Sequence, residues 1–355
     1  MVKTEIIESK LYGGEVTVKF YPNSHRYKVT DPKMGLVDAS MKGVTTYLGI
    51  KDKSAALQSW TAEIAGLHLL DIVEAGNQVT NEDIAVAMNL YNERKEEAAT
   101  IGQKAHDWCE YFIKHQLGEA GFETEPTLPE DPQILLGVDS FLEFVTNNDV
   151  EFIASEKFVY SRKHQYVGQM DFKARVNGKL VCGDFKTSNG LYNTVFAQTG
   201  AYLAADEEEM EAIGTPEEYE GSVAVRLAKE TEEEYRERMA RKNAVRALLG
   251  KEPRQFEPYN PFEVRFSEGR EAYNNNFQGF LHCKNLHKWD EETDFVPSGF
   301  EENYQNMRRL AELLFSRFPE RHIVLTVSPV PLARTFSDGD VFTANSESKS
   351  ILRVV

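Results

Sequence analysis

The sequence has few cysteines and no long apolar run. Its three cysteines, Cys109, Cys182 and Cys283, are odd in number and far apart among 355 residues. They indicate neither a disulfide framework nor a zinc or iron–sulfur site. No apolar run is long enough to span a membrane, and the N-terminus lacks the apolar segment of a signal peptide. We therefore expect a soluble, intracellular protein without a membrane partner.

The chain also lacks a positive charge balance. Its net charge of −17 argues against strong non-specific binding to nucleic acid. The acids concentrate in residues 206–211 and 217–220, whereas basic residues outnumber acids from Glu156 to Lys186. This locally basic stretch, which includes Arg162 and Lys163, permits phosphate binding.

The most informative stretch surrounds Asn177-Gly178, a dipeptide that favours a type I′ turn because both central positions of that turn need positive φ. Residues 168–176 and 179–186 alternate in polarity on either side, which predicts a β-hairpin. The alternation places six apolar side chains on one face: Met170, Phe172, Ala174, Val176, Val181 and Phe185.

The polar face of this hairpin carries two opposed acids. If Val176 pairs with Lys179, Asp171 lies directly opposite Asp184, with Cβ atoms roughly 5 Å apart. A divalent cation bound by both carboxylates would offset their repulsion, and oxygen ligands favour one or two Mg²⁺ or Mn²⁺ ions. Lys186 points the same way and would orient or deprotonate a water. The alternative is an exposed hairpin whose acids pair with neighbouring basic residues.

Residues 81–117 have a long helical pattern without proline, in which His106 lies one turn after Gly102. A single histidine on a helix is usually structural. Gly102, however, removes a side chain and would let a ligand or another backbone come close. His106 is therefore a candidate third metal ligand, with Glu110 as its partner.

A second helical pattern, at 193–205, places Gln198 and Tyr202 on one side. Either Tyr202 is half-buried and Gln198 solvated, or the pair orients Lys186 or contacts a nucleic-acid backbone. In the segment before residue 70, helical spacing predicts that Trp60 belongs to the core.

Further patterns predict a hairpin at 12–30, strands at 156–160, 222–227 and 322–327, and a turn at 338–339. Helices are expected at 134–145, 231–250, 271–286 and 301–318, the second of them starting with a Thr231–Glu234 capping box.

Five motifs occur in a fixed order: Gly102-x-x-x-His106, a strand with Glu156, Gly168-x-x-Asp171, Asp184-Phe185-Lys186-Thr187 and Gln198-x-x-x-Tyr202. Together with the segments F-Y-P-N-S-H-R-Y-K-V and G-V-T-T-Y-L, they resemble the RecB-type branch of the PD-(D/E)XK nuclease superfamily, including phage-encoded and mitochondrial-type exonucleases. The resemblance covers roughly residues 12–230. The PD-(D/E)XK motif has a proline directly before its first aspartate, whereas Met170 stands before Asp171 in this sequence. Gly43 stands where relatives often have serine.

The resemblance implies an α/β fold: a mixed central sheet flanked by helices, with a restriction-endonuclease-like core and helical additions. It implies a nuclease core at 1–230 and, at 231–355, a helical extension with a terminal β segment packed on the core. The implied metal ligands are His106, Asp171, Asp184 and the backbone carbonyl of Phe185. Catalysis would also use Lys186 and Glu156, and the implied nucleic-acid contacts are Gln198, Tyr202, Thr187, Arg162 and Lys163.

The implied function is metal-dependent hydrolysis of DNA by an exonuclease acting in recombination, repair or processing, with other recombination proteins as partners. The location would be the cytoplasm, or the host cytoplasm if the protein is phage-encoded. The four cysteines that hold an iron–sulfur cluster in some relatives are absent, so no such cluster is expected. The alternatives are an endonuclease or junction resolvase, an RNA-directed nuclease on the same site, and a non-catalytic acidic scaffold or nucleic-acid mimic.

Overall fold

The computed structural model describes residues 6–51, 54–188 and 190–292. The chain divides into two compact units, Met1–Leu286 and His287–Val355. The predicted helix at 301–318, strand at 322–327 and turn at 338–339 lie outside the described residues. None of the described helices combines the length and the apolar character needed to cross a lipid bilayer.

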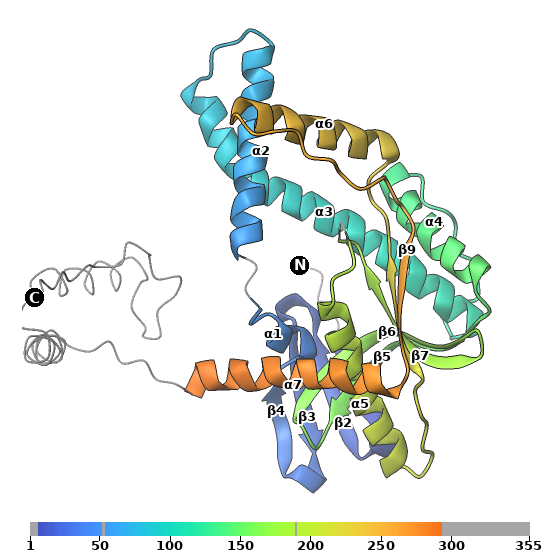
Figure 1. The fold of residues 1–355 in the computed structure, drawn as a ribbon. Helices are drawn as coiled ribbons and strands as arrows, with labels where there is room; N and C mark the ends of the chain where they lie inside the picture. Colours follow the sequence, from blue (N-terminus) through green and yellow to red (C-terminus); the bar gives the residue numbers. More distant parts are fainter. Residues whose placement is uncertain (1–5, 52–53, 189, 293–355) are drawn as a thin grey trace, which may run out of the picture. The chain divides into compact units, whose positions relative to one another are not determined.

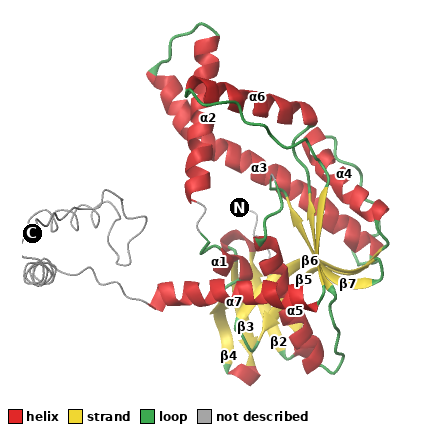
Figure 2. Ribbon diagram, viewed as in Figure 1, coloured by secondary structure: helices red, strands yellow, loops and turns green. Residues whose placement is uncertain are grey.

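An antiparallel sheet of four strands comes first in the chain (Figures 1 and 2). Its strands are β1 (Ile7–Leu11), β2 (Val16–Tyr21), β3 (Arg26–Asp31) and β4 (Leu36–Met41). The hairpin predicted at 12–30 is confirmed, since β2 and β3 pair from Thr17–Thr30 to Tyr21–Arg26. Val16, Val18 and Phe20 alternate with half-exposed residues and are buried, as expected for a sheet with one face on the core.

A second sheet of five strands has the order β5-β6-β7-β8-β9. Its strands are β5 (Val150–Ser161), β6 (Tyr166–Val176), β7 (Lys179–Lys186), β8 (Gly221–Arg226) and β9 (Glu263–Glu268). Only β7 and β8 run parallel, so this sheet is mixed and the predicted α/β class is confirmed. The sheet continues past the predicted boundary at residue 230, because β9 pairs with β8.

The helices are α1 (Val44–Leu48), α2 (Ser54–Glu74), α3 (Asn81–Gln116), α4 (Pro132–Asn147), α5 (Thr194–Ala212), α6 (Glu232–Leu248) and α7 (Arg270–Glu292). The predicted capping box of α6 is present, with Thr231 and Glu234 each bonded to the other's backbone N–H. Helices α3 and α4 pack on one face of the five-stranded sheet around Phe141, Phe172 and Phe185. Helices α1, α5 and the first part of α7 pack on the other face.

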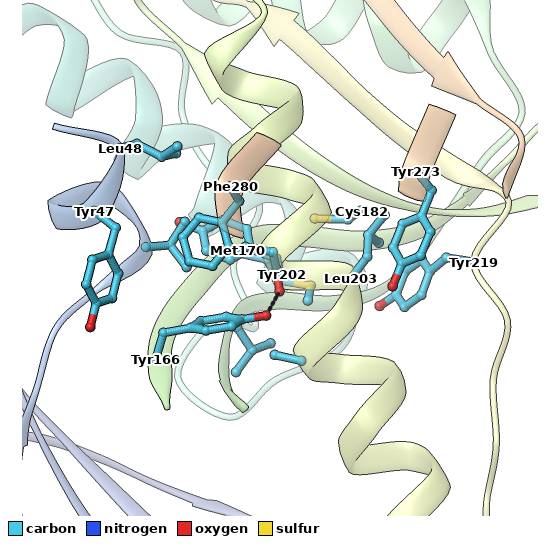
Figure 3. Close-up of a cluster of buried hydrophobic side chains, with 14 of the residues drawn as sticks. Tyr47, Leu48, Tyr166, Met170, Cys182, Tyr202, Leu203, Tyr219, Tyr273 and Phe280 are labelled. Carbon is cyan, nitrogen blue, oxygen red and sulfur yellow. Dashed lines mark hydrogen bonds between the residues drawn. The ribbon is translucent and has the colours of Figure 1, made fainter. Parts of the chain in front are cut away.

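The cluster beneath α5 corrects one prediction about the hairpin. Met170 was assigned to the face of Phe172, but it packs with Cys182 and Tyr202 on the α5 side of the sheet (Figure 3). The change of face occurs within β6, between Met170 and Phe172, because two residues that are two apart share a face only in a regular strand. On the neighbouring strand, Glu156 lies between the pairs Ser155–Phe172 and Lys157–Met170 and has a left-handed backbone with φ of +48°.

Trp60 corrects a second prediction. Its side chain is 37% exposed and meets the ring of Tyr91 on α3 edge-on, with ring centroids 5.2 Å apart. Helix α2 packs on α3 and α6 and lies outside both core clusters of the five-stranded sheet. Helical spacing identified the contacting face of α2 but not the depth of its burial.

Candidate active site

The hairpin of β6 and β7 has the predicted register. Its turn residues Asn177 and Gly178 both have positive φ, 52° and 81°. The strands pair from Val176–Lys179 to Phe172–Gly183, and the ladder ends one position before Asp171 and Asp184. Beyond that point the N–H of Phe185 donates to Asp171 Oδ2 at 2.6 Å. Where the hairpin opens, the Asp171 carboxylate therefore accepts a backbone hydrogen bond in place of a carbonyl of the neighbouring strand.

Gly183 allows this ladder to close, and sequence reasoning missed it. A Cβ atom on Gly183 would lie 1.8 Å from the ring of Phe172, its partner in the ladder. The ring fills the space above the glycine and packs against Phe185. A glycine inside an apolar strand is a known sign of such a close approach, so the signal was present in the sequence.

Asp184 is completely buried, and its two oxygens have different partners. Oδ1 accepts a hydrogen bond of 2.8 Å from Gln198 Nε2. Oδ2 forms an ion pair with the Lys186 ammonium. Burial raises the pKa of Asp184, Lys186 opposes the shift and Asp171 adds to it, so that the pKa is about 6. Burial lowers the pKa of Lys186, but Asp184 and Asp171 outweigh it, and the pKa is raised overall.

His106 extends from α3 and lies between two carboxyl groups. Its Nε2 is 3.1 Å from Asp171 Oδ2, and its Nδ1 is 4.0 Å from Glu156 Oε1. Its ring meets Phe185 edge-on at 5.4 Å. Burial lowers the pKa of His106, but Asp171 and Glu156 outweigh it and raise the pKa to about 9. The structure thus brings His106, Asp171 and Glu156, three of the candidate site residues, close together.

The two acids beside His106 have opposite pKa shifts. Burial and the charge of Asp171 raise the pKa of Glu156 to about 8. Burial also acts to raise the pKa of Asp171, but His106 and Lys186 outweigh it and lower the pKa. Glu110, predicted as the partner of His106, forms an ion pair with Lys114 instead, and its charge helps to raise the pKa of Glu156.

Two glycines let the elements of the site approach one another. A Cβ on Gly102 would lie 2.6 Å from Thr187 Oγ1, so α3 passes directly over the residue that follows β7. His106 is one turn further along α3. A Cβ on Gly168 would lie 2.3 Å from the ring of Tyr202. The Gly102 and Gly168 motifs therefore serve packing around the site.

The predicted nucleic-acid contacts are not brought together. Tyr202 is buried against Gly168, and its hydroxyl accepts from Gln198 at 3.0 Å, so it belongs to the core. Gln198 orients Asp184 rather than Lys186. The sequence treated Tyr202 as half-buried or surface-facing because helical spacing does not reveal depth.

Arg162 and Lys163 lie at the turn between β5 and β6, far along the hairpin from Asp171. Arg162 donates to Asp31 and Glu15 and covers the ring of Tyr12 at 4.0 Å, so its charge is used inside the protein. Lys163 is exposed, and its backbone N–H donates to Glu208. From Tyr166 to Asp171, five steps of β6 span roughly 17 Å. These two residues are not part of the site, whereas the half-buried Thr187 adjoins it.

The donor types fit a hard divalent cation, although the arrangement is not a closed ligand set. In the part of the chain that the structure describes, no three His, Cys, Asp or Glu side chains form a ready metal site. Lys186 and Gln198 engage Asp184, while His106 and the Phe185 amide engage Asp171. Asp184 Oδ2, whose partner is the Lys186 ammonium, is nevertheless a carboxylate oxygen of the kind that Mg²⁺ and Mn²⁺ bind. The use of the Phe185 carbonyl as a ligand stays a prediction.

Comparison with known proteins corrects the predicted family. The sequence model of the GSCFA family matches residues 270–355. This family is not a PD-(D/E)XK nuclease family, and the match lies outside residues 12–230, on which the resemblance rested. No curated protein matches the chain. The predicted membership of the RecB-type branch is therefore wrong. Its motifs are single residues at the spacing of a strand or a helix, and ordinary strands and helices produce the same spacing. The GSCFA match covers a minor part of the chain and says nothing of the site.

Proposed function

We propose that this protein hydrolyses phosphodiester bonds, with DNA as its substrate and Mg²⁺ or Mn²⁺ as its cofactor. One observation carries the proposal: the fully buried Asp184, whose Oδ2 pairs with the Lys186 ammonium, beside the Asp171–His106–Glu156 cluster. Burying several ionisable groups together is costly for a fold, and such groups concentrate at functional sites.

The residues divide the work as follows. Asp171, Asp184 and, after losing its proton, His106 would hold the ion, which when bound would polarise a phosphoryl oxygen and make a bound water more acidic. Gln198 orients Asp184 through Oδ1. Lys186 has a raised pKa and is charged at neutral pH, so it stabilises negative charge at the phosphate rather than accepting a proton. Water would add at phosphorus as the bond to the 3′-oxygen breaks, and its two protons would end on the two products, a 3′-hydroxyl and a 5′-phosphate.

The charge distribution favours local contacts with the substrate. With a net charge of −17, the protein would bind non-specific duplex weakly. Affinity would come from the few groups near the site, and a partner protein of a recombination or repair complex would raise it. A cytoplasmic location is part of the same proposal.

The test is cleavage by the full-length protein with Mg²⁺, with Mn²⁺ and with a chelator. We expect metal-dependent cleavage that Asp184→Asn or Lys186→Ala lowers by about 100-fold or more. Lys179→Ala is the matched control, because Lys179 is on the same hairpin but pairs with Glu268 on the surface. Near-normal turnover by either site variant would contradict the assignment.

The choice of substrate separates the remaining alternatives. An exonuclease degrades linear but not covalently closed circular DNA, an endonuclease cuts both, and an RNA-directed enzyme prefers RNA. A non-catalytic scaffold would cleave none of them with either metal, and Asp184→Asn would leave its behaviour unchanged.

A further inference from the structure

The ends of β7 and β8 lie at one edge of the sheet, because the two strands are parallel. Lys186, at the end of β7, is in register with Arg226, at the end of β8. In open α/β sheets, ligands bind beyond the carboxyl ends of parallel strands. The Leu227 N–H donates to the Lys186 carbonyl at 2.9 Å, so the chain leaves the sheet beside Lys186, two residues before Lys229.

Lys229 differs from the other basic side chains of this region. It is half-buried and makes no hydrogen bond or ion pair with any residue that the structure describes. Three others have acidic partners: Lys186 pairs with Asp184, Arg226 Nε is 3.2 Å from Glu263 Oε2, and Arg238 donates to Glu230 at 2.6 and 2.7 Å.

The chain on both sides of Lys229 is fixed. The Ala228 N–H donates to Ser140 Oγ at 3.3 Å, and the Glu230 carbonyl accepts from the Tyr259 hydroxyl at 2.7 Å. Because both oxygens of the Glu230 carboxylate accept from Arg238, the nearest acid in the chain is already engaged. The backbone thus holds Lys229 in place before any ligand arrives.

The positive charge of an ammonium group in this position is only partly balanced by nearby acids. Burial lowers the pKa of Lys229 because the charged form loses hydration, and Glu230 opposes the shift only in part. Partly buried charges are normally paired. An anion from outside the chain would restore the missing interaction.

We propose that Lys229 binds a phosphate of the substrate strand next to the cleavage site. The proposal rests on the proposed function, which supplies a polyanionic substrate. Three residues of extended chain from Arg226 reach at most roughly 10 Å, and successive phosphates rise by about 3.4 Å along one strand of a duplex. Because adjacent strands lie about 4.8 Å apart, Lys229 is within roughly 15 Å of Lys186, and the phosphate that it binds is within about four or five nucleotides of the scissile bond.

The experiment measures binding apart from cleavage. The full-length Asp184→Asn protein is titrated against a fluorescein-labelled DNA oligonucleotide, single-stranded and duplex, without divalent metal and at several NaCl concentrations. Adding Lys229→Gln should weaken binding and flatten the plot of log K against log salt by about 0.7 for single strands or 0.9 for duplex. Lys229→Arg should retain the slope, and the surface control Lys179→Gln should leave it unchanged.

A second readout separates binding from a structural role. Removing an unpaired, half-buried charge should leave the melting temperature unchanged or higher, whereas loss of a structural ion pair would lower it. An unchanged salt slope in Lys229→Gln, a lowered melting temperature, or no binding by the parent protein would overturn the proposal. If the slope falls while the wild-type protein cleaves nothing, the phosphate site stands and the proposed hydrolysis fails.

Discussion

Gln198 connects the site to the core of the molecule. Its amide donates both to Asp184 Oδ1 and to the Tyr202 hydroxyl, at 2.8 and 3.0 Å. Tyr202 is immobilised by its burial against Gly168. The packing of Tyr202 therefore sets the orientation of the Asp184 carboxylate through Gln198. Such indirect support is typical around catalytic or metal-binding groups.

We predict that Gln198→Ala lowers cleavage by about 10- to 100-fold, the range usual for groups that orient a ligand. The physical reason is that Asp184 Oδ1 loses its hydrogen bond and the carboxylate can rotate. Rates would be measured at saturating Mn²⁺ on linear DNA. Gln103→Ala is the control, because Gln103 on α3 donates to Asp107 at the surface. Equal rates for both variants would remove the orienting role of Gln198.

At the scale of secondary structure, the position of α3 depends on Gly102. A glycine inside a helix normally destabilises it, by about 1 kcal/mol relative to alanine. Here the absent Cβ makes room for Thr187, whose Oγ1 would be only 2.6 Å from it. His106 and Thr187 are thereby held on facing elements, α3 and the end of β7.

We predict opposite effects for alanine at two helical glycines. Gly102→Ala should lower activity and thermal stability, because α3 must move away from Thr187 and carries His106 with it. Gly66→Ala on α2 should leave activity unchanged and raise stability by up to about 1 kcal/mol, because its Cβ would meet open space. Urea denaturation and cleavage assays measure both. A gain of stability in Gly102→Ala would show that α3 and Thr187 can move apart at no cost in free energy.

The hairpin, its register and the long helix of His106 were predictable because each depends on local signals. Asn177-Gly178 fixes the turn, and the turn fixes which residues face one another. The change of face at Met170 was not predictable, because it is a departure from regular alternation within β6 that no residue type in the sequence signals. The engagement of Arg162 by Asp31 likewise joins two sheets far apart in sequence.

At the scale of the whole molecule, a buried ionic network fastens α5 to the five-stranded sheet. Asp206 on α5 is fully buried and pairs with Lys157 on β5 and Lys173 on β6, and it accepts from the Tyr219 hydroxyl. Lys173 also pairs with Glu217. Burial tends to raise the pKa of Asp206, but Lys157 and Lys173 outweigh it and lower the pKa below its usual 3.8.

We predict that Asp206→Asn lowers the free energy of unfolding at neutral pH by about 3–5 kcal/mol, since two lysines lose their buried partner. A carboxyl with a lowered native pKa stabilises above its unfolded pKa and stops doing so as pH falls through its native pKa. The difference between wild type and variant should therefore shrink below about pH 4. Urea denaturation at neutral and acidic pH measures it. A difference that persists at low pH would exclude the carboxylate's charge as its source.

The first sheet has a consequence for synthesis of the protein on the ribosome. Its apolar face, with Val16, Val18 and Phe20, is covered by Phe158, Tyr160 and Val167 of β5 and β6. These covering residues are translated long after the sheet itself. At about 5–20 residues per second, the nascent sheet waits on the order of 10 s with that face in water. During this interval the uncovered face can associate with other nascent chains on the same messenger RNA. The same face is a binding site for chaperones that hold unfolded chains.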